Sequence, residues 1–504
     1  MMNDETKQPG SRFAEIHRTP LDAGWRFDNS YARLPDVFFT RVNPTPVAAP
    51  HLVLFNRPLA ESLGLDPAAF TGPDAAAGFT GNQIFPGAEP IAQAYAGHQF
   101  GNLTRLGDGR AILLGEQLTP AGERFDIQLK GSGPTAYSRR GDGRAALGPM
   151  LREYLISEAM HALGIPTTRS LAVAGTGELV YREQTQPGAI LTRVAASHIR
   201  VGTFEYFAAL GETDALRRLT EYTLRRHFPK RAESDQPALA LLEEVMERQA
   251  SLIAHWMRVG FVHGVMNTDN MALSGETIDY GPCAFVDAYD PATVFSSIDH
   301  HGRYAFGQQP GIAAWNLARL AEALLPLLHA EPETAVARAN GVLESFAERH
   351  HRHRLAALRG KLGLFTAEPG DAALAEELLR WMHETHADYT HTFRNLRPDA
   401  TAESTSPAAA AFTAWHRRWA ERRARQPQSA PEVLRLMHAH NPAVIPRNHL
   451  VEEALAAATI GNDLAPFERL QTALANPYDE AGQPGELLNP PPPDTPACRT
   501  FCGT

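Results

Sequence analysis

Cysteine and positive charge are both scarce in this chain. Only Cys283, Cys498 and Cys502 occur among its 504 residues. Such a sparse, odd set does not form a disulfide framework and is typical of proteins of a reducing cytoplasm. Lys and Arg together number 47 against 57 Asp and Glu, which gives a net charge of -10. No basic field is therefore expected to hold nucleic acid by its phosphates, and we expect no nucleic-acid partner.

Membrane and secretion signals are also missing. No apolar run approaches the length of a membrane span, so we expect no membrane partner. The first residues, MMNDETKQPGSRF, are charged and lack the apolar region of a secretory signal, which favours a cytoplasmic location. The chain has neither a Walker A phosphate loop nor the GxSxG turn of the serine hydrolases.

The composition that remains is that of a globular protein, with 43% hydrophobic and 21% charged residues. At this length it favours two lobes with extensions over a single core. We expect an ordered N-terminal extension that packs on the core, a β-rich N-lobe, a helical C-lobe and a proline-rich, cysteine-containing tail, at residues 1–85, 86–205, 206–487 and 488–504.

Periodicity supports an α+β fold. Residues 111–118 (AILLGEQL) and 124–131 (RFDIQLKG) are β-rich runs separated by a short turn, which predicts a hairpin. Residues 148–164 have apolar side chains at helical spacing and end at Gly164, which predicts a helix. Two further strands follow, and beyond about residue 205 the pattern is helical. The sequence thus predicts a small β-rich lobe and a larger helical lobe.

Two charged residues in the β-rich part have the spacing of a nucleotide site. Lys130 ends the second strand of the predicted hairpin, and Glu153 lies in the first half of the predicted helix. Protein kinases pair a strand lysine with a glutamate of the following helix to position the phosphates of ATP. Lysines at strand ends are also commonly solvated, so this pair alone is a weak signal.

A second group of residues, in the helical part, strengthens the prediction of a nucleotide site. His263 begins a loop, Asn270 follows at the kinase offset, and Asp279-Tyr280-Gly281 stands where kinases have Asp-Phe-Gly. The side-chain oxygens of Asn270 and Asp279 suit a magnesium ion whose other ligands are phosphates and water. Asn, Asp and Gly also favour ordinary turns, which is the alternative interpretation.

The kinase pattern is broken at the catalytic base and at the glycine loop. Val265 stands where kinases have the aspartate that accepts the substrate proton, and Asp269 is the nearest carboxylate able to replace it. No GxGxxG precedes Lys130; GDGR occurs instead at 107–110 and 141–144. Several arginines accompany these glycines, and arginine binds phosphate in a bidentate manner.

These motifs resemble the selenoprotein O family. The resemblance spans nearly the whole chain and rests on AYAGHQFG (94–101), LGDGRAILLGE (106–116), QLKGSGPTAYSRRGDGRAALG (128–148), MLREYLISEAM (150–160), HGVMNTDNM (263–271) and DYGPCAF (279–285). It implies a protein-kinase-like bilobal fold that binds ATP in a flipped orientation, with the γ-phosphate buried. The implied activity is transfer of AMP to Ser, Thr or Tyr hydroxyls of protein substrates; some members also use UTP with manganese.

The resemblance also implies residue roles. Asp269 would be the proton acceptor, Asn270 and Asp279 would bind Mg²⁺ or Mn²⁺, and Glu153 would support Lys130. The residues implied to contact the nucleotide are Gly107, Gly109, Arg110, Lys130, Asp142, Gly143, Arg193, Arg200 and Asp279.

Two other functions stay open at this stage. One is an ordinary kinase that uses Asp269 and transfers the γ-phosphate of ATP. The other is a pseudokinase scaffold that binds nucleotide without catalysis, which Val265 favours and the intact metal-binding pair opposes. Some relatives are thought to carry a regulatory disulfide between the tail and the loop after the Asp-Tyr-Gly motif. Phe295 stands at the expected loop position here, so a bond within CRTFC (498–502) is the other pairing considered.

Overall fold

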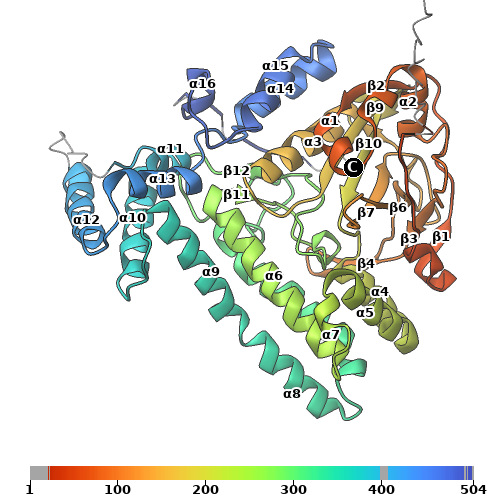
Figure 1. Ribbon diagram of the computed structural model, residues 1–504, viewed down its shortest axis with the longest axis horizontal. Coiled ribbons are helices and arrows are strands. Elements are labelled where there is room, and N and C mark those ends of the chain that lie inside the picture. Colours follow the sequence, from red (N-terminus) through yellow and green to blue (C-terminus); the bar gives the residue numbers. More distant parts are fainter. Residues whose placement is uncertain (1–20, 22, 398–406, 493–494, 497, 502–504) are drawn as a thin grey trace, which may run out of the picture.

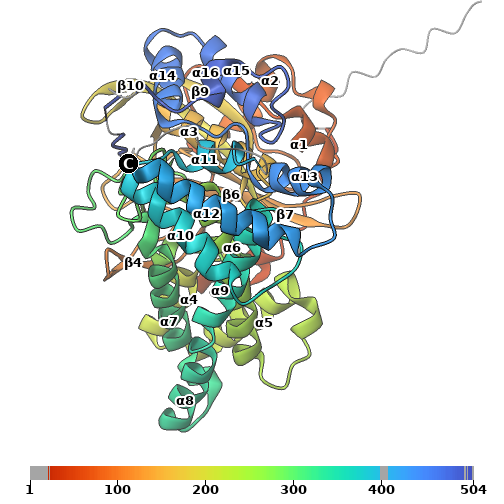
Figure 2. The ribbon, with the colours of Figure 1, turned by 90° about the vertical axis from the view of Figure 1, so that its left-hand side faces the viewer.

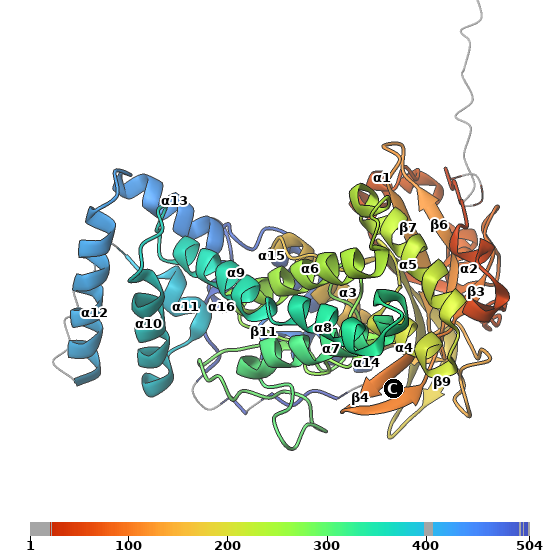
Figure 3. The same cartoon turned by 90° about the horizontal axis from the view of Figure 1, so that it is seen from below.

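A computed structural model describes residues 21, 23–397, 407–492, 495–496 and 498–501. The protein is a mixed α+β structure. Its main sheet lies at one end, and a long helical part extends away from it (Figure 1). Seen from below, α10 (Asp371–Thr385) and α12 (Pro407–Ala424) lie at the end opposite the sheet (Figure 3).

The main sheet has eight antiparallel strands in the order β1-β3-β6-β7-β10-β9-β2, with β8 paired to β10. Its strands are β1 (Phe39–Arg41), β2 (His51–Phe55), β3 (Ile91–Gln93), β6 (Ala111–Leu118), β7 (Arg124–Lys130), β8 (Ala145–Ala146), β9 (Arg169–Tyr181) and β10 (Thr185–Ala195). Because β1 and β2 come from the segment before residue 85, the sheet includes strands from both sides of the expected boundary there.

The predicted hairpin is present as β6 and β7, with Ala111 opposite Lys130. Both central strands are almost wholly buried because helices cover the two faces of the sheet. One face packs against α2 (Gly72–Thr80), and the other packs against α3 (Leu147–Ala162). The predicted helix is α3, and it ends as expected at Gly164, whose φ of 73° suits glycine.

The helical part is built around α6 (Pro237–Val259), which packs against its neighbours in one large hydrophobic cluster. A second cluster fills the space between the far helices and the β11–β12 pair. Figure 2 shows α8 at the tip of the molecule. The other elements are α1 (Arg57–Ser62), α4 (Val201–Leu210), α5 (Thr213–His227), α7 (Gln309–Leu328), α8 (Pro332–Leu343), α9 (Phe346–Lys361), α11 (Tyr389–Arg394), α13 (Ala430–His440), α14 (Asn448–Ile460), α15 (Ala465–Leu474), α16 (Gly485–Leu488), β4 (Ala96–Gln99), β5 (Asn102–Arg105), β11 (Phe261–Val262) and β12 (Ala284–Phe285).

One stretch, Phe306–Leu328, is long and apolar enough to cross a membrane by length and composition alone. It contains α7, whose buried residues include Leu317, Leu320 and Leu324. These side chains belong to the main hydrophobic cluster, together with residues of α4 and α6. Packing within the core therefore accounts for the apolar character of α7.

A buried guanidinium joins the helical part to the sheet. Arg226 on α5 contacts Glu116 of β6 at 2.8 Å and Asp126 of β7 at 2.6 Å. All three side chains are at most 5% exposed. His198 also contacts Asp126, through Nδ1 at 3.0 Å. Removal of Arg226 would leave the buried carboxylate of Asp126 without its arginine, while Glu116 would keep Arg124 at 2.9 Å. An uncompensated buried charge is far more costly than loss of a surface pair.

We expect Arg226→Met to lower the free energy of unfolding by about 3 kcal/mol or more, because it strands buried negative charge. Arg225→Met on the same helix is the matched control: Arg225 is 63% exposed and lies 3.8 Å from Glu221. Its loss should cost less than about 0.5 kcal/mol. Urea denaturation of both variants measures the difference, and equal losses would show that the buried cluster does not stabilise the fold.

Candidate active site

A cleft of about 630 Å³ lies between the sheet and the loops that follow α6. Eleven of the twelve residues that the sequence singled out line it: Gly107, Gly109, Arg110, Lys130, Asp142, Gly143, Arg193, Arg200, Asp269, Asn270 and Asp279. The twelfth, Glu153, is 2% exposed and lies behind Lys130. Residues that are far apart in the sequence thus share one cavity.

Lys130 connects the two parts of the chain. Its Nζ donates to Oε2 of Glu153 on α3 at 2.6 Å and to Oδ1 of Asp279 at 2.7 Å. Lys130 is the last residue of β7, so the strand delivers its amine to the cleft while α3 supplies Glu153 from the opposite side. The pair that the sequence suggested is therefore in direct contact, and it extends to Asp279.

Asp279 receives two further cations. Nη2 of Arg193 lies 2.5 Å from its Oδ1, and Nη2 of Arg200 lies 3.7 Å from its Oδ2. Burial opposes ionisation of Asp279, but the charges of Arg193, Lys130 and Arg200 outweigh it and hold its pKa well below its usual range. Its backbone has a φ of 62°, which is uncommon for a residue other than glycine and characteristic of functional sites.

Arg200 lies at the start of α4 and is surrounded by acidic side chains without a short contact to any of them. Its guanidinium stacks on Tyr95, 4.3 Å from the ring centre, and Nη1 lies 3.9 Å from Oδ1 of Asp108. With Asp279 at 3.7 Å, Arg200 approaches two carboxylates beyond hydrogen-bond length. It is 3% exposed, so these charges act on it with little screening by water.

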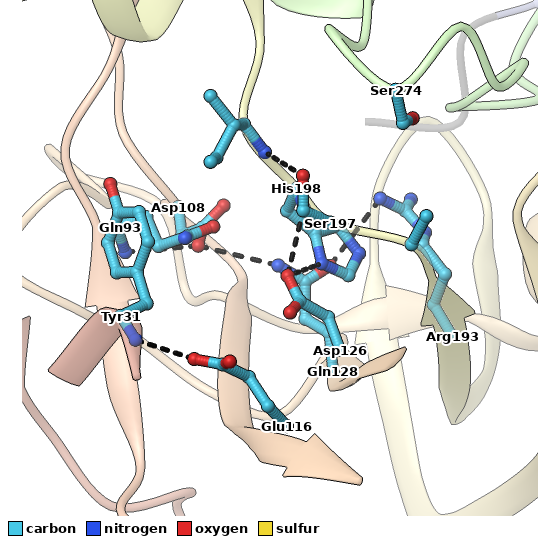
Figure 4. A network of polar contacts seen from close by, with 12 residues as sticks. Tyr31, Gln93, Asp108, Glu116, Asp126, Gln128, Arg193, Ser197, His198 and Ser274 are labelled. Carbon is cyan, nitrogen blue, oxygen red and sulfur yellow. Dashed lines mark hydrogen bonds and ion pairs between the residues drawn. The ribbon is translucent and has the colours of Figure 1, made fainter. Parts of the chain in front are cut away.

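Asp108 was missed as a site residue, although it lies within the first GDGR motif. Its Oδ2 accepts from the backbone N–H of Gln93 at 3.0 Å and from Nε2 of Gln128 at 3.4 Å. Oε1 of Gln128 in turn accepts from Arg193 at 3.4 Å, so Asp108 is linked to Arg193 (Figure 4). Burial raises the pKa of Asp108 to about 6.

Asp269 occupies a slot too narrow for a side chain opposite it. A β-carbon at Gly97 of β4 would overlap Oδ1 of Asp269, and one at Gly202 of α4 would overlap the backbone oxygen of Ala96. These two glycines let β4 pass between α4 and the loop that carries Asp269. Asp269 is 8% exposed and its Oδ1 has no hydrogen-bond partner in the described structure. Burial raises its pKa to about 6.

The β4–β5 hairpin holds the loop that carries Asp269. The backbone N–H of His98 donates to Oγ1 of Thr268 at 2.7 Å, and that of Phe100 donates to Oδ1 of Asn267 at 3.2 Å. Nδ2 of Asn270 donates to the backbone oxygen of Val265 at 2.9 Å, which leaves its amide oxygen as the atom able to bind a metal. Asn267 and the hairpin lie within the motifs HGVMNTDNM and AYAGHQFG, but the sequence assigned them no role, because their roles depend on this packing.

The two GDGR segments form adjacent walls of the cleft. A β-carbon at Gly107 would overlap the ring of Tyr137, and one at Gly143 would overlap the backbone of Gly133. Asp142 lies 2.8 Å from Arg182, which helps to lower the pKa of Asp142. Close packing therefore accounts for these glycines, and they also expose backbone at the cavity.

The fit of a divalent metal rests on oxygen ligands. Asn270 and Asp279 both line the cleft, and Asp108 and Asp269 each have a buried Oδ1 without a hydrogen-bond partner among the described residues. In the described ranges, no group of three or more His, Cys, Asp or Glu residues is arranged to hold a metal ion. The residues present thus fit a metal such as Mg²⁺ that takes the rest of its ligands from phosphate and water.

The tail reaches this region without a covalent bond among the described residues. Cys283 is a buried free thiol and Cys498 is also free, while Cys502 lies outside the described residues. The backbone N–H of Thr500 donates to the oxygen of Phe295 at 2.9 Å, and Oγ1 of Thr500 donates to the oxygen of Pro282 at 2.7 Å. Hydrogen bonds therefore connect the tail to the loop that follows Asp279.

Comparisons with known proteins show the family of the chain. A family model described as "Protein adenylyltransferase SelO" matches residues 23–475. The chain is 58% identical over 486 residues to the "Protein nucleotidyltransferase YdiU" of Syntrophotalea carbinolica, covering 96% of this chain and 99% of that protein. It is 59% identical over 487 residues to the protein of the same name from Geobacillus kaustophilus, covering 96% and 100%. The chain therefore belongs to the SelO family of protein adenylyltransferases.

Proposed function

We propose that this protein transfers AMP from ATP to Ser, Thr or Tyr hydroxyls of other proteins and releases pyrophosphate. Membership of the SelO family and the protein nucleotidyltransferase names of its relatives support transfer of a nucleotidyl group. We also propose a protein-kinase-like bilobal fold, in which the sheet with α3 is the small lobe and the helical part is the large lobe. UTP is a second candidate donor, and it would transfer UMP.

One observation carries the proposal. Lys130, Glu153 and Asp279 form a connected set as in a kinase, while the position of the kinase base is occupied by Val265. Asp269, the carboxylate nearest to Val265 in the sequence, lines the same cleft. The site thus keeps the residues that would bind nucleotide and metal, but its catalytic base would lie at a different position from that of a kinase. This difference favours attack on the α-phosphorus of ATP in place of the γ-phosphorus.

The arginines give this choice a physical reason. Arg193 and Arg200 line the cleft with Lys130 and are almost wholly buried. They would neutralise the phosphates of the triphosphate that lie deepest in the cleft. If the γ-phosphate binds there, the α-phosphate faces outward and the leaving pyrophosphate stays among positive charges. The catalytic contribution is then positioning and charge stabilisation. Gly107, Gly109, Arg110, Asp142 and Gly143 would contact the nucleotide from the two GDGR walls.

Asp269 is the residue that we assign to the substrate hydroxyl. Its side chain lines the cleft, so the carboxylate could accept a hydrogen bond from an incoming Ser, Thr or Tyr hydroxyl. A pKa raised to about 6 makes its carboxylate a better proton acceptor than an exposed aspartate. Asn270 and Asp279 would hold Mg²⁺ or Mn²⁺, and the bound metal would supply neutralisation of phosphate charge.

Two other functions predict different products from the same cleft. A kinase would use Asp269 with ATP in the ordinary orientation and transfer the γ-phosphate. A pseudokinase scaffold would bind ATP and transfer nothing. The unpartnered Oδ1 of Asp269 favours catalysis over the scaffold, because a buried carboxylate oxygen without a hydrogen-bond partner is costly to the fold.

Labelled ATP distinguishes these functions. With Mg²⁺ or Mn²⁺ and a protein acceptor, we expect label from [α-³²P]ATP to enter protein and label from [γ-³²P]ATP to stay out. Asp279→Ala should abolish the transfer, because it removes both a metal ligand and the counter-charge of Lys130 and Arg193. [α-³²P]UTP tests UMP transfer. Label from γ-ATP alone would establish a kinase, and nucleotide binding without any transfer would establish a scaffold.

The narrow slot beside Asp269 gives a second prediction. Gly97→Ala should lower kcat by about 10²-fold while KM for ATP changes little, because the new methyl group displaces Asp269 and leaves the phosphate-binding side chains in place. Gly341→Ala in α8 is the matched control, since its β-carbon meets nothing within 4 Å. Steady-state AMP transfer measures both. Unchanged kcat in Gly97→Ala would refute the role of Asp269 as the group that accepts the proton.

A further inference from the structure

The candidate metal ligand Asp279 is already engaged by positive side chains. Three cations surround it, which we call the cation cluster: Lys130 at 2.7 Å, Arg193 at 2.5 Å and Arg200 at 3.7 Å. Lys130 and Arg193 share Oδ1, and Arg200 faces Oδ2. Both oxygens of the carboxylate therefore lie next to protein charges.

The cation cluster competes with a divalent metal for the same atoms. Glu153 neutralises part of its charge, through contacts of 2.6 Å to Lys130 and 2.7 Å to Arg193. Arg200 stacks on Tyr95 and approaches carboxylates only at longer range, Asp279 at 3.7 Å and Asp108 at 3.9 Å. A divalent ion at Asp279 would stand among these side chains at close range and low exposure, where repulsion between like charges is strong.

Nucleotide phosphates would remove this repulsion. A triphosphate brings several negative charges into the cleft, and arginine and lysine bind phosphate oxygens well. Phosphates that engage the cation cluster would draw it off Asp279 and at the same time supply metal ligands. The longer contacts of Arg200 make it the member of the cluster whose removal disturbs the fold least.

We propose that Lys130, Arg193 and Arg200 hold Asp279 closed to divalent metal until nucleotide phosphates engage them, so that metal and nucleotide bind as one coupled unit. This inference rests on the proposed function only in placing the triphosphate in this cleft. Binding is reciprocal under such coupling: metal strengthens nucleotide binding by the factor by which nucleotide strengthens metal binding. Metal added without nucleotide would then leave Asp279 paired with the cation cluster.

Removal of one member of the cluster should open the metal site without nucleotide. We expect Arg200→Met to raise the affinity for Mn²⁺ alone by about tenfold, a typical size for coupling between two sites. Arg200→Lys retains the charge and should bind Mn²⁺ as weakly as the wild type. Electron paramagnetic resonance of free Mn²⁺ during titration of the nucleotide-free protein measures this without any assay of activity.

Arg182→Gln is the matched control. Arg182 lines the same cleft, but it pairs with Asp142 at 2.8 Å, so its loss changes the net charge equally without touching Asp279. Its Mn²⁺ affinity should equal that of the wild type. Circular dichroism checks that the variants fold, and Lys130→Met provides the same test if Arg200→Met is unstable.

The second arm measures coupling in the wild type. Equilibrium dialysis with α,β-methylene-ATP should show binding tightened by Mn²⁺, and Arg200→Met should reduce that coupling. Tight Mn²⁺ binding by the nucleotide-free wild type, or an equal gain in Arg182→Gln and Arg200→Met, would overturn the inference. Because neither arm needs AMP transfer, the two proposals can fail separately. A gain of metal affinity in Arg200→Met together with no transfer of label by the wild type would refute the proposed function and leave this inference standing.

Discussion

The carboxylate of Asp279 is the point at which separate parts of the chain meet. Lys130 reaches it from the end of β7, Arg193 from β10 and Arg200 from the residue before α4. Glu153 on α3 binds the first two of these cations from behind. One partly exposed carboxylate thus contacts side chains from two strands and from the residue before a helix, and a change in its partners would alter the whole cleft.

The hydrophobic architecture makes this polar centre possible. Helices on both faces of the sheet keep β6 and β7 away from water, so the charges at their ends interact in a medium of low dielectric constant. The same burial would strongly destabilise the fold if these charges were unpaired. They are instead arranged in networks of several charged side chains. Arg226 between Glu116 and Asp126 is a second such network, at a distance from the cleft along the same strands.

Periodicity was enough to predict the local elements. Motif spacing and the family resemblance singled out residues that the fold places in or beside one cleft, while their roles stay predictions. The hairpin that ends in Lys130 and the helix that carries Glu153 have strong patterns, because each side chain alternates or repeats with the geometry of its own element. The kinase-like spacing from His263 to Asn270 and Asp279 located the loop. The mixed α+β class followed from these patterns, while the lobe arrangement and the domain limits stay predictions.

What the sequence did not reveal depends on contacts between distant segments. Asp108 is unremarkable inside a glycine turn until the fold buries it against Gln93 and Gln128. Gly97 lies within the AYAGHQFG motif but was assigned no role, since its importance comes from the oxygen of Asp269 that lies against it. The same holds for the ion pairing of Asp279. Motif spacing predicts that Asp279 belongs to the site, but only the folded structure shows how many cations surround it.

The β4–β5 hairpin also has a consequence for motion. Its two ends are tied to the sheet region, where the backbone N–H of Ala94 donates to Phe38 and that of Asp108 donates to Gln93. Its strands, however, are hydrogen bonded to the loop at Asn267 and Thr268. A rotation of the sheet against the helical part would therefore carry the hairpin with the loop, and the bending would fall on the short links around Tyr95 and Leu106. Asp269 would keep its surroundings throughout such a rotation, while the phosphate-binding wall moved past it.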